Sequence, residues 1–124
     1  MTEPFGARPV KESLLEAARQ LREAGNGLEA ARAARGAALA IEFHLDSLTR
    51  ALASRSIEPR LRGRAERLVA ELEEALRRLW AAERELRGNG ESAAIGELPA
   101  LLQRIAEGEI DLVLEEFRSL GALD

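Results

Sequence analysis

The chain has 124 residues, of which 46% are hydrophobic and 32% are charged, and its formal net charge at pH 7 is −4. This length fits one domain with a single core, and the composition is typical of a folded protein rather than a disordered one. Cysteine is absent, which excludes disulfides, thiol catalysis and thiolate metal ligands. No stretch reaches 18 uninterrupted apolar residues, and the first ten residues lack the pattern of a signal peptide. We therefore expect a cytoplasmic protein with no membrane contact.

A core of leucine and alanine is expected, because aromatic residues make up only 3% of the chain and β-branched residues are few. The sequence divides into a flexible N-terminal tail at residues 1–9 and a single helical domain at residues 10–124. The first helix is predicted from about Val10 to Ala24. The Gly25-Asn26-Gly27 triplet follows it and can supply the left-handed conformations of a helix stop and a tight turn. The first two helices should therefore be antiparallel neighbours.

The central element is a predicted helix from Leu28 to Ala53 with three distinct faces. One face has alternating spacings of three and four residues, which is a heptad seam formed by Ala31, Ala34, Ala38, Ile41, Leu45, Leu48 and Leu52. A second face, which includes Gly36 and Ala40, carries only small side chains and would allow a close helix crossing. Leu39 and Phe43 are four residues apart and emerge on the far side.

A third helix is predicted from about Arg60 to Arg87, opened by Pro59 and carrying a second heptad seam. Together with the central helix it should form an antiparallel hairpin over residues 28–87, with arms of ~40 Å. Val69, Leu76 and Trp80 widen its apolar stripe on one flank.

Two short C-terminal helices are expected within residues 98–120, at about 98–107 and 110–120, after a second turn at Gly88-Asn89-Gly90. Trp80 is the expected position at which this segment packs onto the hairpin. The sequence therefore predicts an all-α fold, an antiparallel bundle of four to five helices built on a long helical hairpin.

The predicted function is non-enzymatic protein–protein interaction, as an adaptor, scaffold or regulatory subunit. The two long helices carry more apolar surface than one hairpin seam uses, and arms of ~40 Å exceed what a terminal helix spans. We therefore expect at least a homodimer, with the small-residue face at a close helix crossing. The candidate protein interface comprises Gly36, Leu39, Ala40, Phe43, Val69, Leu76 and Trp80.

An arginine-rich segment supports an alternative, a nucleic-acid-associated protein that uses residues 55–67. Six arginines and two glutamates give residues 50–67 a net charge of +4, whereas eight acidic residues and two arginines give residues 91–124 a net charge of −6. Pairing of the basic segment with the acidic one, in the same chain or in a second copy, is favoured over phosphate binding, because no aromatic stacking residue accompanies the arginines. The candidate electrostatic patch comprises Arg55, Arg60, Arg62, Arg64 and Arg67.

His44 is the only histidine and raises a less favoured hypothesis, a phosphotransfer module. Such modules typically place Lys and Gly three and four residues after the histidine, where this chain has Ser47 and Leu48. A metal site needs three or four ligands, and the neighbouring Glu42 and Asp46 point elsewhere on the helix. We therefore expect His44 to be a packing residue, and we predict no catalytic residue, no metal site and no cofactor.

Overall fold

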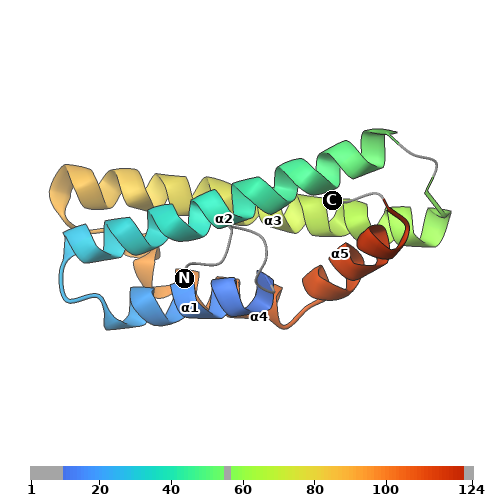
Figure 1. Cartoon of the computed structure of the whole chain (residues 1–124). Coiled ribbons are helices and arrows are strands. Elements are labelled where there is room, and N and C mark those ends of the chain that lie inside the picture. Colours follow the sequence, from blue (N-terminus) through green and yellow to red (C-terminus); the bar gives the residue numbers. More distant parts are fainter. Residues whose placement is uncertain (1–9, 55–56, 122–124) are drawn as a thin grey trace, which may run out of the picture.

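The fold, described for residues 10–54 and 57–121 of a computed structural model, is all-α (Figure 1). Within these ranges there are five α-helices, one short 3-10 helix and no strand. The elements are α1 (Val10–Glu23), α2 (Gly27–Ser54), α3 (Pro59–Asn89), η1 (Ala93–Gly96), α4 (Leu98–Ala106) and α5 (Ile110–Ser119). The predicted helical bundle is confirmed, with helix ends within about two residues of the predicted ones. The predicted tail at residues 1–9 lies outside the described residues.

Helices α2 and α3 form the predicted long antiparallel hairpin. Their direction is visible in Figure 1 and in two contacts: Arg62 donates to the Leu52 carbonyl near one end, and Trp80 donates to Glu42 farther along. With 28 and 31 residues, the two helices are ~42 and ~46 Å long. The hairpin is therefore the frame against which the shorter helices pack.

The shorter helices line one side of this hairpin. Helix α4 runs antiparallel to α1, because Arg22 bonds Gln103 at 2.8 Å while Val10 bonds Asp111, just beyond the end of α4, at 2.9 Å. Helix α5 continues toward the end of the bundle where α3 begins (Figure 1). Two helices in tandem thus extend farther along the hairpin than one. The sequence argument for a dimer assumed that no terminal helix spans the long hairpin, and it did not consider two helices in tandem. The length of the hairpin is therefore no longer an argument for a dimer.

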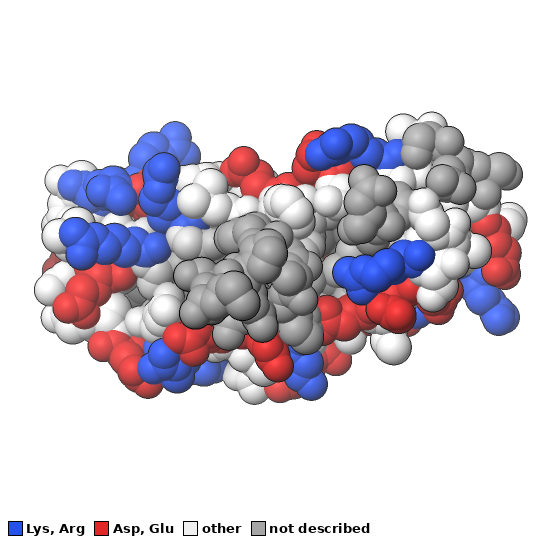
Figure 2. Space-filling view, in the orientation of Figure 1, with Lys and Arg blue, Asp and Glu red and all other residues white. Residues whose placement is uncertain are grey.

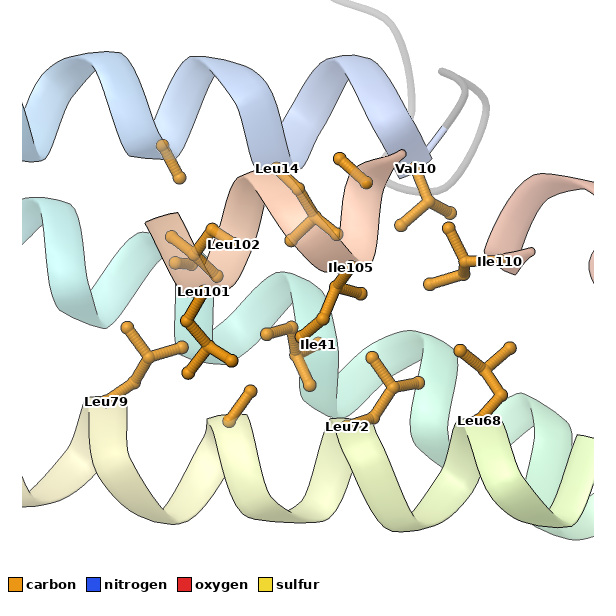
Figure 3. Packing of buried hydrophobic residues seen from close by; sticks show 14 of the residues in the cluster. Val10, Leu14, Ile41, Leu68, Leu72, Leu79, Leu101, Leu102, Ile105 and Ile110 are labelled. Carbon is orange, nitrogen blue, oxygen red and sulfur yellow. The ribbon is translucent and has the colours of Figure 1, made fainter. Parts of the chain in front are cut away.

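The main core joins residues of all five α-helices. Figure 3 shows Leu68, Leu72 and Leu79 of α3 pointing toward Ile41 of α2 and toward the side chains of α1, α4 and α5. Helix α4 contributes Leu101, Leu102 and Ile105 to this layer, and α1 contributes Val10 and Leu14. The core is aliphatic and alanine-rich, with Phe117 its one fully buried aromatic side chain among the described residues.

Two faces of α2 are buried. From the predicted seam, Ala31, Ala34, Ala38, Ile41 and Leu48 are buried, while Leu45 and Leu52 are half-buried. From the small-residue face, Ala33, Ala37 and Ala51 belong to the main core cluster. Helix α1 packs directly against α2, so these three alanines of the small-residue face are buried within one chain.

The two Gly-Asn-Gly turns meet at one end of the bundle. A Cβ atom built on Gly27 would lie only 2.5 Å from the Gly90 carbonyl oxygen. Gly90 has a φ of +80°, and its N–H donates to the Leu86 carbonyl at 2.9 Å, so it ends α3 in the predicted left-handed conformation. The same prediction for Gly25-Asn26-Gly27 is wrong, since no residue of that triplet has a positive φ.

The first triplet works instead as a helix start. The Asn26 side-chain oxygen accepts from the Glu29 N–H at 2.9 Å, and the Glu29 carboxylate accepts from the Gly25 N–H at 2.8 Å. This reciprocal arrangement resembles a capping box and satisfies two backbone donors at the start of α2. Gly27 is required there for close approach to Gly90 rather than for a left-handed backbone.

Candidate functional site

The outer face of α2, the side turned away from the core, carries exposed apolar side chains. We define this face by the exposed positions Leu28, Arg32, Arg35, Gly36, Leu39, Glu42, Phe43, Asp46 and Arg50. Its three large apolar residues Leu28, Leu39 and Phe43 are 53%, 42% and 45% exposed, and Leu112 and Leu120 are the only other large hydrophobic residues with comparable exposure in the described part of the chain. The outer face therefore carries three of the five exposed large apolar side chains of the described residues.

Leu39 and Phe43 stack along this face, because residues four apart lie one above the other on a helix. Gly36 lies beside them, one turn before Leu39. A Cβ atom built on Gly36 would meet nothing within 4 Å, so the space above this glycine is open. A second helix could approach the α2 backbone closely at this point.

Trp80 borders the outer face and is held there by α2. Its Nε1–H donates to the Glu42 carboxylate at 3.0 Å, and the Arg35 guanidinium lies 5.9 Å from its ring centroid, at the limit of a cation–π contact. Trp80 is half-buried and packs against the main core. These contacts hold the Trp80 indole against α2.

The structure divides the predicted interface into three groups. Gly36, Leu39 and Phe43 are exposed, whereas Val69 and Leu76, like Trp80, are half-buried against the core. Ala40 is buried, with 8% exposure, and is therefore not available to a partner. A small side chain at the border between a buried and an exposed helix face carries no sequence signal that shows which face it belongs to.

Charges on the outer face are ordered around Leu39. Arg32 and Arg35 precede it, and Glu42 and Asp46 follow it. Figure 2 shows basic side chains gathered over the end of the bundle that holds the first half of α2 and the end of α3. Asp46 also pairs with Arg50, four residues later, and both side chains are largely exposed.

The arginine-rich segment is partly occupied by the acidic C-terminal segment of the same chain. Arg64 donates to Glu109 at 3.1 Å and to Glu116 at 2.9 Å, so it bridges two acidic groups at α5. The hydrogen bond to Glu116 is the main reason why the pKa of Arg64 is raised above its ordinary value. The basic segment and the acidic C-terminal segment are therefore paired within the same chain at Arg64.

The other arginines of that patch are placed differently. Arg62 donates to the Leu52 carbonyl at 3.2 Å and thereby helps join α2 to α3. Arg60 and Arg67 are exposed. Arg55 lies outside the described residues. The four described arginines of the patch therefore do not form one continuous exposed surface.

His44 is enclosed, with 6% exposure, and its ring meets Phe43 edge to face at a centroid distance of 5.1 Å. Burial lowers its pKa, an effect that Asp111 opposes and Arg118 reinforces. Its sequence neighbours Glu42 and Asp46 accept from Trp80 and pair with Arg50, respectively. Within the described residues no group of three His, Asp or Glu side chains could hold a metal ion.

Asp111 is a structural residue that the sequence did not reveal. Its two carboxylate oxygens accept from the backbone N–H groups of Val10 and Lys11, at 2.9 and 3.1 Å. It therefore caps α1 from a position 100 residues away in the chain. The only local signal is an acidic residue in the first turn of α5, which gives no indication of this distant partner.

Comparisons of the chain with protein-family models, with curated proteins and with solved structures found no match. None of the helices in the described ranges is long and apolar enough to cross a membrane.

Proposed function

We propose that this chain is a non-enzymatic protein-interaction module, acting as an adaptor, scaffold or regulatory subunit, which self-associates through the outer face of α2. The observation that carries this proposal is the group of exposed apolar residues Leu28, Leu39 and Phe43 on one side of a helix whose other sides are buried. Single exposed leucines are common on soluble proteins. Apolar side chains grouped on one face and rimmed by charges are instead typical of protein-binding surfaces.

The position of His44 argues against phosphotransfer. A phosphoryl donor must reach an imidazole nitrogen in line, whereas the His44 side chain is buried next to α5 residues that influence its pKa. We therefore propose a packing role for His44 and no catalytic role for this site.

The contacts of Arg64 argue against nucleic acid as the main partner. A phosphate at this position would compete with the carboxylates of Glu109 and Glu116, which already accept hydrogen bonds from the guanidinium. The acidic α5 also places negative charge beside any bound phosphate backbone, which opposes binding. Protein is therefore the partner class that the surface favours.

The test is the native mass, measured by light scattering on a sizing column at low and high salt. We expect a dimer for the natural sequence and a monomer for Leu39→Asp, because a buried, unpaired carboxylate at the centre of the contact is costly. Leu112→Asp is the matched control, since Leu112 is 61% exposed but lies on α5, and we expect it to remain dimeric. Circular dichroism should show the same helical content in all three proteins. A natural sequence that is monomeric at all accessible concentrations would contradict self-association.

A further inference from the structure

We infer that two copies of the chain pair through their α2 helices in antiparallel orientation, with the two-fold axis at Leu39. The inference rests on the proposed self-association and adds the partner's orientation and register. The inference starts from the order of residues along the outer face of α2. These residues lie outside the core, so core packing does not determine their order.

This order is complementary about Leu39. Arg32 lies seven residues before Leu39 and Asp46 lies seven after it. Seven residues are close to two helical turns, or ~10.5 Å, so both side chains point to the same side as Leu39. In an antiparallel pair with its axis at Leu39, Arg32 of one copy faces Asp46 of the other, and the symmetry produces this ion pair twice.

The next positions follow the same relation. Arg35 lies four residues before Leu39 and Phe43 lies four after it, so a guanidinium meets an aromatic ring across the interface. Leu28 lies eleven residues before Leu39 and Arg50 lies eleven after it, which brings an exposed leucine against the aliphatic part of an arginine. Each of the three exposed apolar residues of the outer face thereby has a counterpart in the other copy.

A parallel pair has the opposite consequence. In a parallel pair, Arg32 of one chain would face Arg32 of the other, and Asp46 would face Asp46. Like charges would therefore face each other at both positions. Like-charge contacts of this kind select against a binding mode even where apolar contacts are similar. The charge order of the outer face therefore selects the antiparallel orientation.

Existing contacts within one copy leave room for this pairing. Among the described residues Arg32 makes no ion pair, and the pair between Asp46 and Arg50 is exposed at both side chains, by 60% and 78%. An exposed ion pair of this kind contributes little to stability, so Asp46 can also pair with Arg32 of the other copy at small cost. Gly36 leaves open space next to Leu39, so it lets the second helix approach.

The first experiment uses Leu39→Cys, because the chain has no cysteine and a single introduced thiol gives an unambiguous signal. At a two-fold axis the two thiols face each other within reach of a disulfide, so we expect rapid covalent dimer formation under mild oxidation. Leu112→Cys is the matched control, because Leu112 is more exposed than Leu39 but lies on another helix, and it should cross-link only slowly.

The second experiment exchanges charges. We expect Arg32→Glu and Asp46→Arg each to raise the dimer dissociation constant roughly tenfold, and the double variant to return it close to the natural value. Gly36→Ala should also weaken the dimer, although its added Cβ meets nothing within 4 Å in one copy and should not lower the thermal stability of the monomer.

The outcomes separate this inference from the proposed function. A dimer that Leu39→Asp dissociates, but that shows neither the Leu39→Cys cross-link nor charge rescue, would overturn the register and keep the proposed surface. A natural sequence that is monomeric at all accessible concentrations would overturn both. Rapid cross-linking together with charge rescue would establish the antiparallel pair.

Discussion

Replacing Gly27 by alanine should destabilise the protein, although alanine is normally the better residue in a helix. The added Cβ would lie 2.5, 2.9 and 3.0 Å from the oxygen, Cα and carbonyl carbon of Gly90. All three are backbone atoms at the end of α3, so a side-chain rotation cannot relieve the overlap. The two turns must separate, and overpacking of this kind typically costs about 1–3 kcal/mol.

Gly88→Ala is the matched control, because Gly88 belongs to the second Gly-Asn-Gly triplet but lies within α3. Its added Cβ meets nothing within 4 Å, so the change should stabilise the helix by about 0.5–1 kcal/mol. The same glycine-to-alanine substitution is therefore expected to lower the stability at Gly27 and to raise it at Gly88, although both glycines belong to Gly-Asn-Gly triplets. Gly90→Ala should again be unfavourable, by about 1–2 kcal/mol, because the φ of Gly90 is +80°.

Thermal and urea unfolding at one fixed protein concentration would measure these differences, since self-association makes apparent stability depend on concentration. For a domain of this size, 1 kcal/mol corresponds to roughly 3–6 °C in Tm. Gly27→Ala should therefore melt several degrees below the natural sequence and Gly88→Ala a few degrees above it. If Gly27→Ala were as stable as Gly88→Ala, the contact between the two turns would be refuted.

Three further predictions concern the core, the tertiary cap and the buried histidine. Leu72→Ala and Leu48→Ala should each cost about 2–5 kcal/mol in urea unfolding, because both side chains are fully buried, and a loss below about 1 kcal/mol would contradict the proposed seam. Asp111→Ala should cost about 0.5–2 kcal/mol and speed amide exchange in the first turn of α1, whereas equal exchange in both proteins would argue against the cap. Burial lowers the pKa of His44 below 6.5, so the unfolded chain binds more protons as the pH falls below about 6.5, and the free energy of unfolding should decrease toward the lowered pKa. Between pH 7.5 and 5.5 this decrease should be smaller in His44→Gln, and an identical decrease would exclude His44 as its source.

The helices and seams could be predicted because their signals are local. Heptad spacing, a proline at the start of α3 and a glycine at its end act over a few residues, and all three led to correct boundaries. Helical geometry alone also separated Leu39 and Phe43 from the seam, but it left open whether another helix covers them. These features do not depend on which helices are neighbours.

Features that join distant segments could not be predicted. The cap from Asp111 to Val10 and the contact between Gly27 and Gly90 depend on how α5 and α3 are positioned relative to α1 and α2. A capping side chain or a glycine carries no sequence signal that identifies a distant partner. The burial of Ala40 belongs to the same class, because alanine is compatible both with a buried helix contact and with an exposed surface.

The uneven distribution of charge along the sequence follows from the position of α5. A basic segment at the start of α3 and an acidic C-terminal segment look like two separate interaction surfaces when the chain is read in order. In the fold, Glu109 and Glu116 lie against Arg64, so part of the positive charge is neutralised within the molecule. A charged partner at this end would have to compete with a tethered helix that is always present at high local concentration. No described helix competes in this way on the outer face of α2, which is why we propose that face for an external protein partner.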